Sequence, residues 1–219
     1  MTAYSDIEAR AADVHLAIFG GFHPTPEDKA PASCRTLLLL GPKEPGFWPH
    51  VTATEIFNDG APDPLDRWSR RTIGRLACDL GAKALFPFGG PPWHPFIAWA
   101  KRTGRAWGSP VSLLVHDTAG LMVSYRGALA LTDHIPLPPV PREAPCGTCD
   151  QPCRAACPVS ALSGDGYDTE ACHGFLDTDA GQSCMTAGCQ VRRECPVSQS
   201  YGRQPDQSAF HMRSFHPCP

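Results

Sequence analysis

The sequence lacks a long apolar run, a concentration of positive charge and a leader of the kind that directs export. No segment approaches the roughly 18 consecutive apolar residues of a membrane-spanning helix. The charged residues alternate in sign and sum to a formal net charge of −3, so no basic stripe is present for nucleic acid. Near the N-terminus, acidic residues stand where a signal peptide carries positive charge, and no adequate apolar core follows. We therefore expect a cytoplasmic protein that binds neither membrane nor nucleic acid.

Proline and glycine, by contrast, are plentiful, at 24 and 20 of the 219 residues. This composition indicates much irregular structure. Hydrophobic residues make up 42% of the chain, which is enough for a globular core and too much for a disordered one. The length fits one large domain or two modest ones.

Cysteine is the most informative residue: the chain has 11, and nine of them follow Pro145. Eight of those nine fall into two sets of four, each of which ends in a Cys-Pro pair. The first set is Cys146, Cys149, Cys153 and Cys157, and the second is Cys172, Cys184, Cys189 and Cys195. Eight thiolates are the ligand count of two [4Fe–4S] clusters.

The spacing suggests how the ligands are shared between the two clusters. A bacterial ferredoxin run is Cys-x2-Cys-x2-Cys-x3-Cys-Pro, and its fourth cysteine binds the other cluster. Here the run is one residue longer between the second and third ligands. Because proline suits the first turn of a helix, we expect each Cys-Pro pair to open a helix that carries its thiolate to the other cluster. The predicted ligands are Cys146, Cys149, Cys153 and Cys195 for cluster 1, and Cys157, Cys172, Cys184 and Cys189 for cluster 2.

Disulfides and structural zinc are the competing interpretations of these cysteines. Disulfides need an oxidising compartment, which the absence of an export signal contradicts. Zinc would accept four cysteines but usually pairs two short Cys-x-x-Cys knuckles rather than one four-cysteine run. Cys34 and Cys78 stand in apolar settings and are expected in the core. Cys218 is not expected to be a ligand.

The predicted fold class is α+β or α/β. The first 134 residues alternate between helix and strand signals, which predicts a layered α/β domain with a mixed sheet and flanking helices. Ser5 and Glu8 form a capping box for a helix that is expected to reach Gly20. Further predicted elements are strands at 35–40 and 83–88, helices at 64–80 and 95–103, and strands at 111–116 and 121–131 around a turn.

The predicted domains are therefore an α/β domain over 1–134, a Pro-rich connector over 135–145 and a small, irregular two-cluster domain over 146–219. The connector contains four prolines between residues 136 and 141, a composition typical of an extended segment. Inorganic clusters would replace much of the hydrophobic core of the last domain.

Four motifs resemble epoxyqueuosine reductase, in the same order along the chain. Residues 102–117 are similar to that family's AGLGWIGKNTLLIHP, 131–139 to TDLPLPP, 146–149 to CGSC and 157–162 to CPTGAI. Residues 167–176 are similar to LDARRCISYLT, which marks Cys172 as a cluster ligand. The resemblance implies a cobalamin-binding α/β domain of the kind shared with reductive dehalogenases, followed by a ferredoxin-like domain with two [4Fe–4S] clusters.

The chain also departs from that family. The family places an acidic residue in a VDSGP-like motif, where this chain has the loop 86–95 without a carboxylate. Four residues of this loop and one later residue are the candidates for a cobalamin pocket, namely Gly89, Gly90, Trp93, His94 and Arg105. His94 and Tyr125 are the candidate catalytic residues, although a histidine or tryptophan in a Pro-rich loop more often serves packing.

Two functions from different classes follow. The first is a ferredoxin-like electron-transfer protein whose partner is another redox protein. The alternative is an oxidoreductase in which the clusters reduce the cobalt of cobalamin and a small-molecule substrate is converted. A zinc-bound structural protein is a third interpretation, which metal analysis distinguishes.

Overall fold

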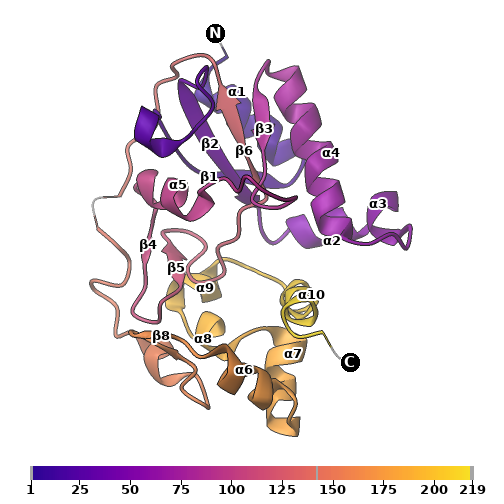
Figure 1. The fold of residues 1–219 in the computed structure, drawn as a ribbon, viewed down its shortest axis with the longest axis vertical. Coiled ribbons are helices and arrows are strands. Elements are labelled where there is room, and N and C mark those ends of the chain that lie inside the picture. The colour runs from indigo at the N-terminus through magenta and orange to yellow at the C-terminus, as the bar shows by residue number, and fades with distance from the viewer. Residues whose placement is uncertain (1, 142, 218–219) are drawn as a thin grey trace. The chain divides into compact units, whose positions relative to one another are not determined.

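The computed structural model describes residues 2–141 and 143–217. It divides into two compact units, which we describe separately (Figure 1). Of the described residues, the first unit contains 2–105 and 124–141, and the second contains 106–123 and 143–217.

The first unit is built on a four-stranded sheet with the strand order β1-β2-β6-β3. Its strands are β1 (Leu16–Phe22), β2 (Thr36–Pro42), β3 (Lys83–Leu85) and β6 (Gly127–Leu131). All three neighbouring pairs are antiparallel. The prediction of a mixed sheet was therefore wrong. Alternation of helices and strands favours parallel pairing, but strand direction depends on which end of the sheet each connection returns to, and spacing alone does not determine that.

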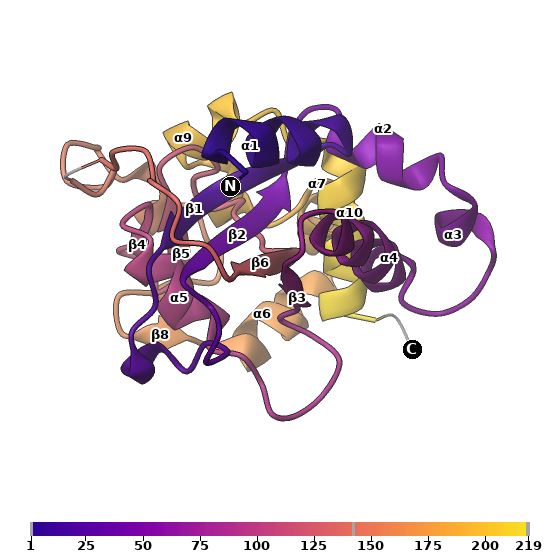
Figure 2. The same ribbon diagram turned by 90° about the horizontal axis from the view of Figure 1, so that it is seen from above.

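The two central strands form the core of this unit. Every residue of β2 and β6 is buried, and the run of four leucines at 37–40 is 0% exposed. Strands buried on both faces appear in a sequence as continuous apolar runs, which is why β2 was predicted correctly. In Figure 2, α1 (Tyr4–Asp13) and α4 (Pro64–Asp79) lie on one side of the sheet and α5 (Phe96–Arg102) on the other.

Helix α4 begins as its sequence predicts, with Asp63 at the N-cap and Pro64 in the first turn. Its apolar face buries Leu65, Trp68, Ile73 and Leu76. The loop before it, which follows α2 (Phe47–Thr52) and α3 (Glu55–Asn58), is closed by one arginine of the helix.

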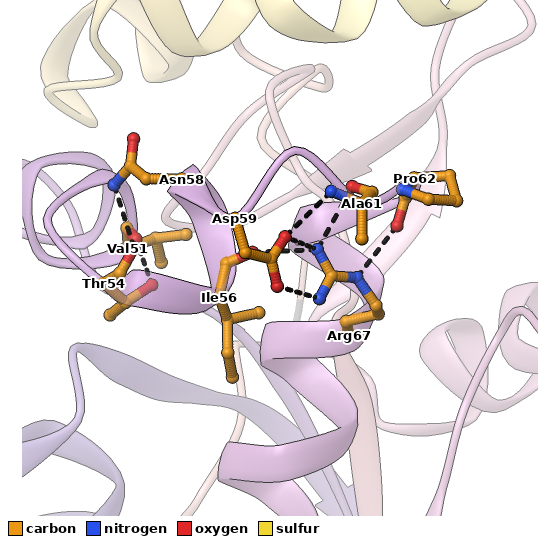
Figure 3. Close-up of polar contacts among 8 residues, drawn as sticks. All are labelled: Val51, Thr54, Ile56, Asn58, Asp59, Ala61, Pro62 and Arg67. Atoms are coloured by element: carbon orange, nitrogen blue, oxygen red, sulfur yellow. Dashed lines mark hydrogen bonds and ion pairs between the residues drawn. The ribbon is translucent and has the colours of Figure 1, made fainter.

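Arg67 makes this closure through both its charge and its fixed fork of N–H groups (Figure 3). Its guanidinium lies 2.6 Å from a carboxylate oxygen of Asp59 and donates hydrogen bonds to the carbonyl oxygens of Ile56, Ala61 and Pro62. The Asp59 carboxylate accepts hydrogen bonds from the Arg67 guanidinium and from the Ala61 N–H, and these hold the pKa of Asp59 at about 2, below its ordinary value.

The N-terminal helix is shorter than predicted. It ends at Asp13, where the chain turns through His15 and enters β1. The predicted continuation to Gly20 was wrong. The apolar residues 16–19 instead form the first part of β1, where Ile18 and Phe19 are buried. The cap is also different: the backbone N–H of Ala3 donates to the Asp6 carboxylate at 3.3 Å.

The second unit consists of short elements and turns. It contains two hairpins, β4 (Ala106–Gly108) with β5 (Leu114–His116) and β7 (Leu162–Ser163) with β8 (Gly166–Tyr167). Its helices are α6 (Thr169–Leu176), α7 (Gln182–Ala187), α8 (Gln190–Arg193), α9 (Pro196–Ser200) and α10 (Pro205–Phe215), with 3-10 turns η2 (Pro152–Ala155) and η3 (Asp179–Gly181). The prediction that this part is small and irregular agrees with these lengths.

Residues 106–123 supply this unit with its apolar wall. Val111, Val115 and Leu121 are buried in one cluster with Cys153 and Cys195. The expected boundaries placed this segment with the N-terminal domain and paired its strands with one another. Instead, β5 pairs with β4, and β6 belongs to the sheet of the other unit. The segment packs with the thiols because a cysteine-lined core still needs apolar side chains around it.

None of the helices in residues 2–141 and 143–217 is both long and apolar enough to cross a bilayer.

Candidate metal centre

All eight candidate ligands belong to the second unit. Three of them, Cys153, Cys184 and Cys195, are buried, and the other five are partly buried. Within the described residues every cysteine is a free thiol, so no disulfide engages any of the eight.

The first thiol group consists of Cys146, Cys149, Cys153 and Cys195. Burial and then the charges of the other three raise the pKa of the Cys146 thiol. Burial and the charges of Cys195 and Cys149 likewise raise the pKa of Cys153. Cys153 and Cys195 are buried in one cluster against which Cys146 packs, so Cys195 has returned across about 40 residues of chain to join the early cysteines.

The second thiol group consists of Cys157, Cys172, Cys184 and Cys189. The pKa of Cys172 is raised by burial and by the charges of Cys157 and Cys184. The pKa of Cys189 is raised by burial and, to a smaller extent, by Cys184. Cys157 and Cys189 also pack against the apolar cluster that contains Cys153 and Cys195, so the division of the eight thiols between two clusters, like the binding of iron, stays a prediction.

Backbone and side-chain donors point at the sulfurs of both groups. In the first group, the N–H of Gln151 donates to Cys149 Sγ at 3.3 Å. In the second, the N–H of Ala161 donates to Cys157 Sγ and the hydroxyl of Tyr167 donates to Cys172 Sγ, both at 3.2 Å. Hydrogen bonds from the Val191 and Arg192 backbone act on Cys189.

This donor set fits [4Fe–4S] clusters. Such clusters need four thiolates each, and their sulfurs are stabilised by N–H donors and partial burial. No three cysteine, histidine or carboxylate side chains of the described residues converge closely enough to hold a single metal ion. In a cubane each thiolate binds a different iron, so its four sulfurs surround a cage rather than one point.

The two Cys-Pro pairs behave differently. Pro196 opens helix α9, with Cys195 at its N-cap, as expected. Pro158 opens no helix: the N–H of Ser160 bonds the Cys157 carbonyl at 3.1 Å, and Ser160 has a φ of 52°. The prediction of a helix after Cys157 was wrong because the chain must turn back at once into the β7–β8 hairpin, and proline suits a tight turn as well as a helix start.

The remaining cysteines were predicted not to bind a cluster. Cys34 is buried, and burial raises its pKa to about 11, so it is a core thiol as predicted. Cys78 is exposed on α4, and its predicted place in the core was wrong because it lies on the outer face of that helix. Cys218 lies outside the described residues.

The residues predicted for a cobalamin pocket all belong to the first unit. Gly89 and Gly90 have positive φ values of 103° and 107°. A Cβ on Gly89 would stand 1.8 Å from the guanidinium of Arg70, so at Gly89 the close approach is to a protein side chain. Trp93 is 64% exposed.

The other pocket candidates contact different elements. His94 stacks on Trp99 of α5, and burial lowers its pKa. The guanidinium of Arg105 donates to the Ile18 carbonyl at 3.2 Å, and Tyr125 meets the Phe19 ring edge-on at 6.0 Å.

A cavity of about 640 Å³ is present in the first unit. It lies between α1, the α2–α3 segment and α4, over Trp68 and Leu76, with charged residues of both signs at its rim. None of the predicted pocket residues lines it. The cavity therefore does not bear on the predicted corrin pocket at the loop 86–95, which stays a prediction.

Sequence reasoning missed two residues beside the second thiol group, Tyr167 and Arg192. The Arg192 guanidinium donates to the Leu121 carbonyl and lies close enough to Cys189 and Tyr167 for their charges to act on it. Part of the residue reaches the surface, but its charged end is enclosed, and burial lowers its pKa. The sequence has adjacent arginines at 192 and 193, and nothing in it indicates which of the two side chains is buried beside the thiols.

The likeness of this chain to known proteins lies in its fold. The sequence matches no protein-family model and no curated protein. Among solved structures, the crystal structure of selenomethionine-labelled epoxyqueuosine reductase matches with a TM-score of 0.53 and 14% sequence identity. The match covers 94% of this chain and 68% of that one. In fold, the chain resembles epoxyqueuosine reductase. At this identity the likeness to epoxyqueuosine reductase concerns the fold alone, and at that level it confirms the resemblance seen in the motifs.

Proposed function

We propose that the second unit binds two [4Fe–4S] clusters and that the protein transfers single electrons to or from another redox protein. The supporting observation is that the last cysteine of each run interacts with thiols of the other run. Cys195 joins the early cysteines, and Cys157 joins the late ones. This is the arrangement of two-cluster ferredoxins, in which the last cysteine of each run serves the other cluster.

The residues of this chain have separate tasks in that function. The thiolates bind iron, while the apolar wall of Val111, Val115 and Leu121 keeps water from the sulfurs. The donors to Cys149, Cys157, Cys172 and Cys189 stabilise negative charge on the ligands. Free thiols in this number fit a reducing compartment such as the cytoplasm.

The test is the iron and acid-labile sulfide content of protein purified without oxygen. We expect about eight iron atoms and eight sulfides per chain, four of each for each cluster. Cys184→Ser should lower both numbers by about half, whereas the exposed Cys78→Ser on α4 should leave them unchanged. Zinc in place of iron would instead support the structural-protein interpretation.

A second candidate is a cobalamin-dependent reductase. It is favoured by the fold match, which covers 94% of the chain and so includes the large first unit, a part that a plain ferredoxin does not need. We derive no step through cobalamin, because the contacts described for Gly89, His94 and Arg105 are all with protein groups. Anaerobic protein titrated with cobalamin tests it: tight binding with a base-off spectral shift supports the reductase, and no binding at high micromolar cobalamin excludes it.

A further inference from the structure

The two thiol groups differ in the charge and hydrogen-bonding around them. Two donors from outside the group's own helices reach the second group, the Tyr167 hydroxyl on Cys172 and the Ala161 N–H on Cys157, both at 3.2 Å. The N–H groups of Val191 and Arg192 in α8, the helix that begins after Cys189, act on the Cys189 thiol as well. Sulfurs that accept more hydrogen bonds tolerate additional negative charge on the cluster better.

A buried cation adds to this difference. The guanidinium of Arg192 is fixed by the Leu121 carbonyl and lies beside Cys189 and Tyr167. Leu121 is itself held in place, because its N–H donates to the Ser198 hydroxyl at 2.8 Å. An enclosed charge is screened by salt much less than an exposed one, so its field acts at nearly full strength on the adjacent thiols.

The surroundings of the first group are weaker. The Gln151 N–H donates to Cys149, and the backbone N–H of Cys153 acts on its own thiol. The nearby cation, Arg154, is exposed, and its guanidinium donates to the Gln151 side chain at 3.2 Å. Its charge acts on Cys153 as the smallest of several influences. Solvent and salt screen such a charge.

From this asymmetry we infer that the second thiol group holds the cluster of higher reduction potential, and that Arg192 and Tyr167 set its potential. The inference rests on the proposed function. On reduction a cluster gains one electron from a one-electron donor, a reduced flavin or iron–sulfur protein, and no bond to a cysteine is broken. The added negative charge is stabilised more where a fixed cation and a hydroxyl donor face the ligands. The first electron to enter therefore rests on cluster 2.

The experiment is a dithionite redox titration of the whole anaerobic chain, followed by electron paramagnetic resonance. Wild-type protein should show two reduction steps, with the signal altered by Cys172→Ser appearing at the higher potential. Arg192→Gln removes the charge and should favour oxidation of that cluster at least tenfold, a downward shift of about 59 mV. Arg192→Lys keeps the charge and should recover most of the loss.

Two further variants keep the test decisive. Tyr167→Phe retains the ring and removes only the hydroxyl, so it should lower the same potential by a smaller amount, even if Arg192→Gln fails to load iron. Arg154→Gln is the matched control beside the first group and should shift neither step appreciably. Equal potentials in the wild type, an unshifted step in both Tyr167→Phe and Arg192→Gln, or a shift confined to Arg154→Gln would overturn the inference while leaving the proposed function intact. If wild-type protein purified without oxygen contains no iron, both the inference and the proposed function are overturned.

Discussion

The two units of this chain obtain their cores in different ways. The first unit buries a sheet whose central strands are apolar at every position. The second has hairpins of two or three residues per strand and helices of 4 to 11 residues, packed around sulfur. Isolated helices this short are marginal in water. Hydrophobic burial therefore accounts for the first unit, whereas we expect the second to depend on what its thiols bind.

Removal of iron should produce the largest difference in behaviour between the two units. We expect the amides of α6, α7 and α8 to lose protection from hydrogen exchange after anaerobic chelation, because metal binding and folding are coupled. Protection of β2 and β6 should persist. Hydrogen exchange followed by mass spectrometry measures both regions in one sample. Full protection of α6 to α8 in iron-free protein would contradict the dependence on clusters.

A cavity in the core of the first unit should destabilise that unit and leave the second unit unaffected. Leu39→Ala removes a side chain that is 0% exposed at the centre of β2 and should cost about 2–5 kcal/mol of unfolding free energy in the first unit. Iron content should stay at the wild-type value. Urea denaturation followed by iron analysis provides both numbers.

The control for this cavity is Ile97→Ala, which truncates an aliphatic side chain that is 69% exposed on α5. It should change the unfolding free energy by no more than about 0.5 kcal/mol. An equal loss in the two variants would show that β2 is not the core of the unit.

A smaller effect is expected where residues 106–123 join the cysteine segment. Ser198→Ala removes the acceptor of the Leu121 N–H and leaves a buried donor unsatisfied, at a cost of about 1–3 kcal/mol in the second unit. Ser200→Ala, in the same helix but exposed, is the matched control. Cluster loss in urea, followed by visible absorption, measures the difference, and identical curves would argue against this junction.

The smallest expected effect concerns pH and the loop that Arg67 closes. The Asp59 pKa, about 2, lies below its ordinary value, so the pair stabilises the loop above pH 4 and this contribution is lost as pH falls towards 2. A carboxyl carbon-13 titration between pH 5 and 2 measures it. In Arg67→Gln the Asp59 midpoint should rise towards the ordinary value; an unchanged midpoint would exclude the hydrogen bonds from Arg67 as the cause.

Much of the first unit was predictable because its signals are local. The four leucines at 37–40 and the Asp63-Pro64 start of α4 each carry enough information in a few residues. The end of α1 and the antiparallel pairing of the sheet were not predictable from local signals. Residues 16–19 suit either a helix or a strand, and only their pairing with β2 decides between the two.

The sequence by itself determined that eight cysteines are set out in two Cys-Pro-terminated runs, because ligand type and spacing are covalent properties of the chain. Only the tertiary structure decided that Pro158 turns rather than opens a helix, that 106–123 pack against the thiols, and that Arg192 rather than Arg193 faces Cys189. Each of these depends on which distant group fills the adjacent space. Such information is shared between segments far apart in the chain and is not carried by either one alone.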